Sequence, residues 1–163
     1  MNPINYDPSP AENAFDKIKS FASDTDDESL RDVINKSLEI VEESFTRYKP
    51  ENVSVCFNGG KDCVVMLHIV HAVHQKLFPD KQLKSFYVSE KKTFSEVDSF
   101  MEDTIGVYKL SNKTYEEPMK TALAQMLDED KEVLATMLGV RTGDPGDSGD
   151  VNVSDLKVLY CRF

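Results

Sequence analysis

The segment VSVCFNGGKDC, at positions 53–63, carries the strongest indication of fold in the chain. Residues 53–57 are apolar or small and rich in β-branched side chains, which is typical of a buried β-strand. Residues 58–61, Asn-Gly-Gly-Lys, have the composition of a turn, and from 62 to about 78 the apolar residues return at helical spacing. The segment therefore predicts a strand, a glycine turn and a helix in direct succession.

Strands and helices are predicted to alternate on both sides of this segment. Alternation of this kind favours an α/β fold with an open, mainly parallel sheet and helices on both faces. The spacing of apolar residues indicates helices at 30–48, 96–105 and 116–127, strands at 85–88, 107–110 and 133–140, and a further possible strand at 157–160.

Composition divides the chain into three parts. Residues 1–29 are rich in Pro, Asp and Ser and predict an acidic, loosely ordered leader, although the apolar residues between positions 15 and 21 have the spacing of one helix edge. Residues 30–145 hold the alternating elements and form the predicted α/β domain. Residues 146–163 contain at most one strand and are predicted to be a divergent or truncated tail.

Charge and composition exclude several classes of function. The 163 residues include 19 Lys or Arg against 29 Asp or Glu, and the formal net charge of −10 repels a nucleic-acid backbone. No apolar run approaches the roughly 18 residues of a membrane span, and the N-terminus lacks the features of a signal or transit peptide. Cys56, Cys63 and Cys161 form neither a disulfide framework nor a metal-binding pair. We therefore expect a cytoplasmic protein with no nucleic-acid or membrane partner.

The first candidate site is the stretch 57–63, Phe-Asn-Gly-Gly-Lys-Asp-Cys. Gly59 and Gly60 permit a tight turn and a close approach of backbone to an anion, and the helix that follows offers unpaired N–H groups. Lys61 supplies positive charge for a phosphate, and Asp62 could cap the helix or hold Mg²⁺. The spacing is not that of a Walker A loop. An ordinary turn beside a solvated helix start is the alternative, although open α/β sheets bind ligands at this end of a strand.

The second candidate site is the stretch 139–145, Gly-Val-Arg-Thr-Gly-Asp-Pro. If the first and fourth strands are neighbours, this loop and the first one face each other where the strand order reverses. Arg141 would then contact a phosphate through two hydrogen bonds, and Asp144 could reach a metal, a ribose or a lysine. The alternative for this loop alone is a polar turn ended by Asp-Pro.

The histidines and cysteines are weaker candidates. His68, His71 and His74 fan across about 120° of a helix, so their side chains cannot converge on one metal ion and are predicted to be partly exposed. Cys63 begins a helix, where a thiolate is stabilised, but no base is evident and a packed residue is favoured. Cys56 is predicted to lie in the core.

Taken together, these motifs resemble a known family. Residues 55–63, continuing into 66–68, and the G-x-R-x-x-D-P motif at 139–145 are similar to motifs of the eukaryotic FAD synthases (FMN adenylyltransferases) of the PAPS-reductase-like group. The resemblance covers roughly residues 30–145. Further blocks of the family resemble, in the same order, residues 93–97, 103–105 and 117–123.

This resemblance implies an adenine-nucleotide α-hydrolase-like, Rossmann-like fold that transfers AMP from ATP to FMN with Mg²⁺, giving FAD and pyrophosphate. The loop would cradle the phosphates, and the second motif would serve the nucleotide and flavin. The catalytic residues implied are Asn58, Asp62 and Arg141, with Asp62 also the magnesium ligand. The nucleotide-binding residues implied are Phe57, Asn58, Gly59, Gly60, Lys61 and Asp144.

Two departures from the family keep alternatives open. PAPS reductases carry Asp-Thr-Gly after the second strand, where residues 89–92 here are Ser-Glu-Lys-Lys. FAD synthases continue past the G-x-R-x-x-D-P motif into a flavin-binding half, which residues 147–163 do not resemble. The alternatives are a catalytically impaired ATP-binding module without the flavin half, and a PAPS-reductase-like relative.

Overall fold

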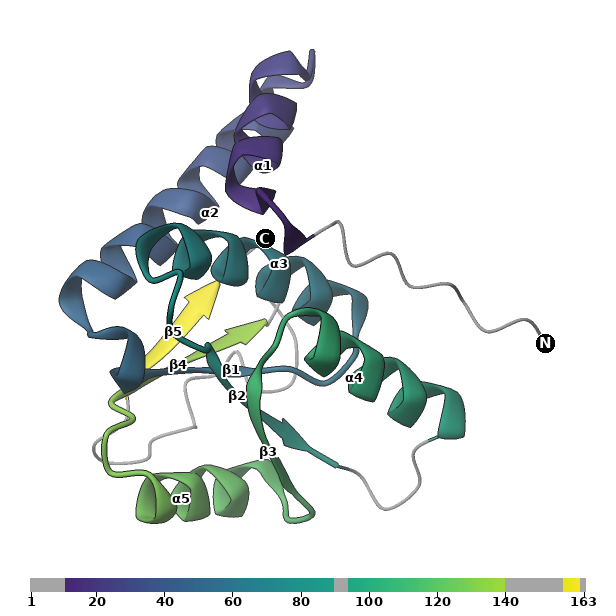
Figure 1. Ribbon diagram of the computed structural model, residues 1–163, viewed down its shortest axis with the longest axis vertical. Helices are drawn as coiled ribbons and strands as arrows, with labels where there is room; N and C mark the ends of the chain where they lie inside the picture. The colour runs from purple at the N-terminus through teal and green to yellow at the C-terminus, as the bar shows by residue number, and fades with distance from the viewer. Residues whose placement is uncertain (1–10, 90–93, 140–156, 162–163) are drawn as a thin grey trace.

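Five parallel strands form a single sheet in the order β3-β2-β1-β4-β5 (Figure 1). The computed structural model describes residues 11–89 and 94–139, and the backbone of 157–161. The strands are β1 (Val53–Cys56), β2 (Lys84–Val88), β3 (Ser111–Tyr115), β4 (Ala135–Gly139) and β5 (Lys157–Cys161). The helices are α1 (Ala14–Asp24), α2 (Glu28–Arg47), α3 (Lys61–Leu77), α4 (Ser95–Val107) and α5 (Met119–Glu129).

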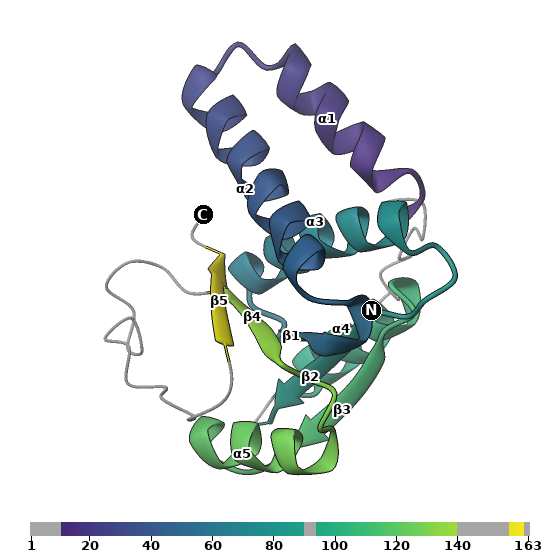
Figure 2. The same cartoon turned by 90° about the vertical axis from the view of Figure 1, so that its left-hand side faces the viewer.

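Helices cover both faces of the sheet, which confirms the predicted fold class (Figure 2). Alternate residues of a strand point to opposite faces, so each strand contributes to two cores. Val55 of β1 and Met137 of β4 belong to the larger core, which α2, α3 and α4 enclose. Cys56 and Leu138, the next residues along, belong to the smaller core, which α5 covers. None of the helices in the described ranges is long and apolar enough to cross a membrane.

The prediction of a loosely ordered leader is wrong for residues 14–24, which form α1. Ala14 and Ala22 are buried, and Phe15 and Ile18 pack against the larger core, so this short helix has a continuous apolar side. The two acidic residues of α1, Asp16 and Asp24, are exposed, and most of the acidic run at 24–28 lies beyond the end of this helix. The helices α1 and α2 together form a hairpin that rises from the body of the molecule (Figures 1 and 2).

The third strand was predicted at 107–110 but lies at 111–115. The apolar residues Tyr108 and Leu110 are buried in the turn that ends α4, where the Tyr108 N–H donates to Thr104 O at 3.0 Å. Lys109 has φ +48° and reverses the chain there. β3 itself, Ser-Asn-Lys-Thr-Tyr, is an edge strand, so most of its side chains remain exposed and polar. The other predicted strands, 157–160 included, are confirmed to within two residues.

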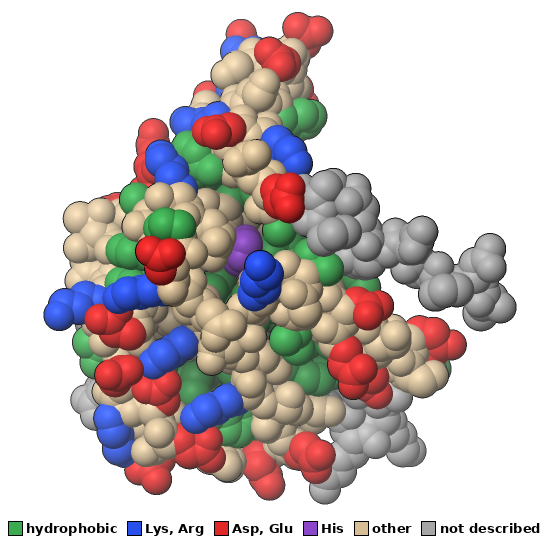
Figure 3. All heavy atoms as spheres, viewed as in Figure 1, with side chains coloured by type: hydrophobic (Ala, Val, Ile, Leu, Met, Phe, Trp, Pro, Cys, Tyr) green, Lys and Arg blue, Asp and Glu red, His purple; other side chains and the backbone are tan. Residues whose placement is uncertain are grey.

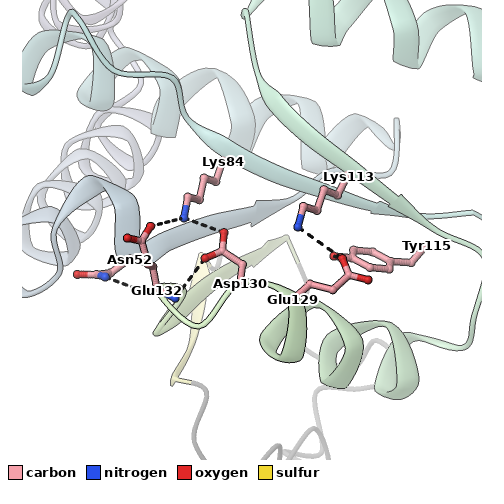
Figure 4. Close-up of polar contacts among 7 residues, drawn as sticks. All are labelled: Asn52, Lys84, Lys113, Tyr115, Glu129, Asp130 and Glu132. Carbon is pink, nitrogen blue, oxygen red and sulfur yellow. Dashed lines mark hydrogen bonds and ion pairs between the residues drawn. The ribbon is translucent and has the colours of Figure 1, made fainter.

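A polar network ties the start of β4 to the start of β2 (Figure 4). Lys84 Nζ lies 2.7 Å from Asp130 Oδ2 and 3.2 Å from Glu132 Oε2. Asn52 donates through Nδ2 to Glu132 O at 2.6 Å. The side chains of Lys84 and Asp130 are each 22% exposed, so solvent screens their attraction less than that of a surface pair. The network fixes the connection between α5 and β4, and therefore the place of β4 beside β1.

Lys84→Met is expected to lower the free energy of unfolding by about 1–2 kcal/mol, because it leaves the half-buried Asp130 carboxylate without its cation. Lys131→Met is the matched control, since the ion pair of Lys131 with Asp128 is 73% and 84% exposed. That control is expected to lose less than about 0.5 kcal/mol. Urea unfolding of both variants measures the difference, and equal losses would contradict the structural role of the network.

Candidate functional site

The first candidate loop lies where the strand order reverses. β1 pairs with β2 on one side and with β4 on the other, so the chain leaves β1 at the point from which the sheet grows in two directions. In open parallel sheets, a crevice for ligands lies at this point, outside the carboxyl ends of the strands. The condition set for the second motif, that the first and fourth strands are neighbours, is met, because β1 pairs with β4 and Val55 lies opposite Met137.

The loop is held by backbone and side-chain hydrogen bonds. Phe57 is fully buried, and its N–H donates to Phe86 O at 3.0 Å, so the loop starts from a rigid strand end. Asn58 Oδ1 accepts from the N–H of Gly60 at 3.0 Å, which closes a tight Asx turn. Gly59 has φ +74°, a left-handed conformation that favours glycine. The loop therefore has the hydrogen bonding of an ordinary turn, and Asn58 and Gly60 are exposed to solvent in it.

Helix α4 lies against this loop, which sequence reasoning missed. A Cβ atom at Gly59 would lie 3.2 Å from Met101 Sδ and 3.6 Å from Phe100 Cδ1. Gly59 is thus required both by its backbone angle and by the closeness of α4. The two residues of α4 are about 40 positions away along the chain, and nothing in their local pattern indicates this contact.

The first turn of α3 follows the loop directly. Gly60 occupies the N-cap and has no side chain to accept from the N–H groups of that turn. Lys61 is exposed, and Asp62 is half-buried within the same turn. A helix N-terminus with a lysine beside it favours an anion, and a carboxylate at the same place suits a divalent cation.

Two buried cysteines flank the loop. Cys63 lies in the first turn of α3, and its Sγ lies 4.0 Å from Gly139 O at the end of β4. Burial raises the pKa of the Cys63 thiol, and burial raises the pKa of Cys56, inside β1, to about 12. Both are therefore packed thiols at neutral pH, as the sequence predicted, and not activated nucleophiles.

The second candidate loop begins at the end of β4. Gly139 is described and lies against Cys63, so the chain leaves β4 next to the first turn of α3. Arg141 and Asp144 lie outside the described residues, and their roles remain predictions.

The three histidines of α3 are more buried than predicted. His74 is fully buried and His71 is 5% exposed, whereas His68 is half-buried and its Nδ1 lies 2.9 Å from the Tyr108 hydroxyl. They contact aromatic rings: the His71 ring lies 4.9 Å from that of Tyr108, and the His74 ring 5.5 Å from that of Phe45. His71 also lines a cavity of about 690 Å³ between α1, α3 and the end of α4. A histidine is visible in the hollow beneath the α1–α2 hairpin (Figure 3).

Burial lowers the pKa of both His71 and His74 to about 4. At neutral pH these two side chains are uncharged members of the core. In the described part of the chain, no group of three or more His, Cys, Asp or Glu side chains could hold a metal ion.

Curated proteins that are similar to this chain include probable FAD synthases. The chain is 32% identical over 122 residues to a probable FAD synthase of Schizosaccharomyces pombe, a match that covers 71% of this chain and 46% of that protein. It is 32% identical over 113 residues to a probable FAD synthase of Caenorhabditis elegans, covering 69% of this chain and 22% of that protein. The chain therefore spans less than half the length of these curated relatives, and the predicted resemblance to FAD synthases is confirmed.

Solved structures agree with these relatives. The fold matches the crystal structure of Candida glabrata FMN adenylyltransferase in complex with FMN and the ATP analogue AMPCPP, with a TM-score of 0.82 and 25% identity over 94% of this chain and 61% of that one. The same enzyme in complex with FAD and pyrophosphate matches equally well, with a TM-score of 0.82. Residues 52–141 match the phosphoadenosine phosphosulfate reductase domain family. Since that match covers more than half of the sequence, the chain belongs to the phosphoadenosine phosphosulfate reductase domain family.

Proposed function

We propose that this chain is an FAD synthase-like adenylyltransferase, which transfers AMP from ATP to FMN and releases pyrophosphate. The observation that carries the proposal is the glycine loop between β1 and α3, at the reversal of strand order, in a fold shared with an FMN adenylyltransferase that binds FMN and AMPCPP. The chain spans 61% of that enzyme, so the activity is assigned here by inference.

The proposed roles follow from the loop geometry. Phe57, buried at the carboxyl end of the central strand β1, anchors the loop, and the backbone at Asn58, Gly59 and Gly60 approaches the phosphates of ATP. Lys61, exposed beside the loop, neutralises phosphate charge. These local features must act against the net charge of −10, since both substrates are anions.

The second loop is proposed to complete the site. Gly139, the last residue of β4, lies beside Cys63 in the first turn of α3, which supports this proposal. Arg141 is then proposed to contact the nucleotide phosphates, and Asp144 to bind on the nucleotide and flavin side.

Asp62 is proposed to hold Mg²⁺ together with the phosphates of ATP. Magnesium in proteins is bound by one or two carboxylates plus substrate phosphates, so a single half-buried carboxylate next to a phosphate loop fits this ion. When bound, the ion would neutralise charge on the phosphates during transfer.

The reaction needs no covalent nucleophile on the protein. A phosphate oxygen of FMN attacks the α-phosphorus of ATP, the bond from that phosphorus to the bridging oxygen breaks, and pyrophosphate leaves with the electron pair. Catalysis then consists of positioning and charge neutralisation, with Asn58 and Arg141 beside the transferred group. The raised pKa of the buried Cys63 thiol agrees with a mechanism that does not use it.

A second candidate function is an ATP-binding module without turnover. The short extent of the match favours this candidate, because the chain matches only 46% of the S. pombe relative and 61% of the C. glabrata enzyme. A third candidate, a PAPS-reductase-like activity, follows from the family match at residues 52–141. We also infer a cytoplasmic location and no nucleic-acid partner; the free thiols of Cys56 and Cys63 and the net negative charge support these inferences.

The test is to incubate the chain with ATP, Mg²⁺ and FMN and to follow FAD and pyrophosphate by chromatography. FAD formation is the expected result, and riboflavin in place of FMN is the control, because it lacks the attacking phosphate and should give no product. ATP binding without formation of FAD would favour the ATP-binding module. An absence of ATP binding would overturn both the adenylyltransferase and the ATP-binding module.

A further inference from the structure

Gly59, the middle residue of the glycine loop at 58–60, packs directly on helix α4. A Cβ atom at this position would lie 3.2 Å from Met101 Sδ, 3.6 Å from Phe100 Cδ1 and 3.7 Å from Met101 Cγ. We propose that Met101 is a positioning residue, whose side chain holds the glycine loop in the single conformation that the proposed binding of ATP requires. The ligand named here rests on the proposed function, whereas the support of the loop by Met101 does not.

The composition of the glycine loop gives it little stiffness of its own. Glycine has more accessible backbone conformations than any other residue, so fixing two in succession costs more conformational entropy. The hydrogen bond from the Gly60 N–H to Asn58 Oδ1, at 3.0 Å, restrains the loop from within, although both residues are exposed. Gly59, at φ +74°, is partly buried. Its contact with α4 therefore adds a restraint from outside the loop.

Met101 is itself held in one place by the core. It is 3% exposed and belongs to the larger core, together with Phe57 just before the loop and Cys63 shortly after it. Side chains in a close-packed core keep a defined arrangement. The larger core thus supports the loop at both ends and, through Met101, in its middle.

Loss of this support is expected to reduce the time that the loop spends in its binding conformation, and apparent affinity falls by the same fraction. Met101→Ala should weaken the binding of ATP with Mg²⁺ about fivefold to tenfold, which corresponds to a competent fraction of about 10–20%. Isothermal titration calorimetry measures the dissociation constant.

A second measurement reports the loop without any ligand. Selective ¹⁵N labelling of the seven glycines makes the Gly59 amide observable by NMR. In the absence of ATP, its order parameter should fall from about 0.85, the value of rigid backbone, toward about 0.6 in Met101→Ala.

Met126→Ala is the matched control, because Met126 is also 3% exposed but lies in the smaller core, on α5. Both substitutions leave the void of a methionine side chain, so both should lower the unfolding temperature by a similar amount. Only Met101→Ala should change the order parameter of Gly59 and the affinity for ATP. Met101→Leu is the conservative variant: its side chain reaches as far as the sulfur, and it should bind ATP within about twofold of the wild type.

Met101→Val replaces Met101→Ala if the alanine variant does not fold, since valine ends at Cγ and still fills more of the core. An unchanged order parameter of Gly59 would overturn the inference, whether or not the wild type binds ATP. Equal losses of affinity in the Met101 and Met126 variants would also overturn it, because they would show a general loss of packing. If the wild type does not bind ATP and the order parameter falls only in the Met101 variant, the proposed function fails while the support of the loop by Met101 is confirmed.

Discussion

Asp62→Asn is expected to lower FAD formation at least about a hundredfold, because it removes the carboxylate proposed to hold Mg²⁺ against the phosphates, an effect of several kcal/mol in metal-assisted transfer. The substitution keeps the size of the side chain and its place in the first turn of α3. A loss of about 0.5 kcal/mol in stability is expected from the weaker interaction with the helix N-terminus. That loss is too small to unfold the domain, so the fall in the rate of FAD formation would measure the role of the Asp62 carboxylate in the reaction.

Dependence on magnesium distinguishes a ligand from a structural residue. In the wild type, Mg²⁺ should strengthen ATP binding, and Asp62→Asn should require at least about tenfold more Mg²⁺ for the same effect. Asp62→Glu retains the negative charge and should recover part of the strengthening of ATP binding by Mg²⁺. Asp32→Asn, at an exposed position of α2, is the matched control and should change neither quantity. If Asp62→Asn and the wild type had the same magnesium dependence, Asp62 would not be the ligand.

The part of the fold that could be predicted is the part in which local sequence and final environment agree. Residues 53–63 have the local preferences of a buried strand and a turn, and they occupy a buried strand and a turn, so β1, the loop and α3 were predicted to within two residues. β3 could not be predicted, because an edge strand is paired on one side only and keeps polar side chains, whereas the apolar Tyr108 and Leu110 are buried in a turn.

Only the part of the candidate site that depends on local sequence, the glycine loop, could be predicted. The conformational preferences of Asn58 and Gly59 are local, since Asn58 accepts a hydrogen bond through its own side chain and Gly59 lacks a Cβ atom, so the loop could be identified from the sequence. The cover of Gly59 by Met101, and the contact of Gly139 with Cys63, join residues far apart in the chain. Contacts of that kind depend on packing, which no local pattern encodes.

The burial of the histidines also depends on distant residues, and it predicts a strong acid sensitivity. His74 is fully buried against Phe45 of α2 and Phe78, and His71 lies under Tyr108 at the end of α4. Within the described residues, both ring nitrogens of His74 and Nδ1 of His71 have no hydrogen-bond partner. A charge on His68 would repel a proton from His71, and charges on His71 and Lys81 would repel one from His74. A hydrogen bond with the backbone of Tyr108 offsets only part of the effect of burial on His71. Protonation is therefore costly in the folded state.

The direction in which stability changes with pH follows from the pKa of these histidines in the unfolded and the folded state. In the unfolded chain, a histidine binds a proton below about pH 6.5, whereas in the folded state the pKa of His71 and His74 is lowered to about 4. Between these values the unfolded state binds more protons, so stability is fully present above pH 6.5 and falls as the pH decreases. At pH 5 the loss is about 2 kcal/mol for each histidine. Together the two losses are a large fraction of a typical domain stability of about 5–15 kcal/mol.

Urea unfolding at pH 7, 6 and 5 measures this loss, and His74→Leu should remove about half of it. The variant should be at least as stable as the wild type at pH 7, since an apolar side chain replaces an unpartnered imidazole between two phenylalanine rings. His68→Gln is the comparison, because His68 is half-buried and bonded to the Tyr108 hydroxyl, and it should change the pH dependence less. Partial burial raises the pKa of Asp130, but its hydrogen bond and ion pair with Lys84 lower this pKa below the usual value, so Asp130 titrates below this range. An unchanged loss between pH 7 and pH 5 in His74→Leu would show that the imidazole is charged or solvated in the folded protein.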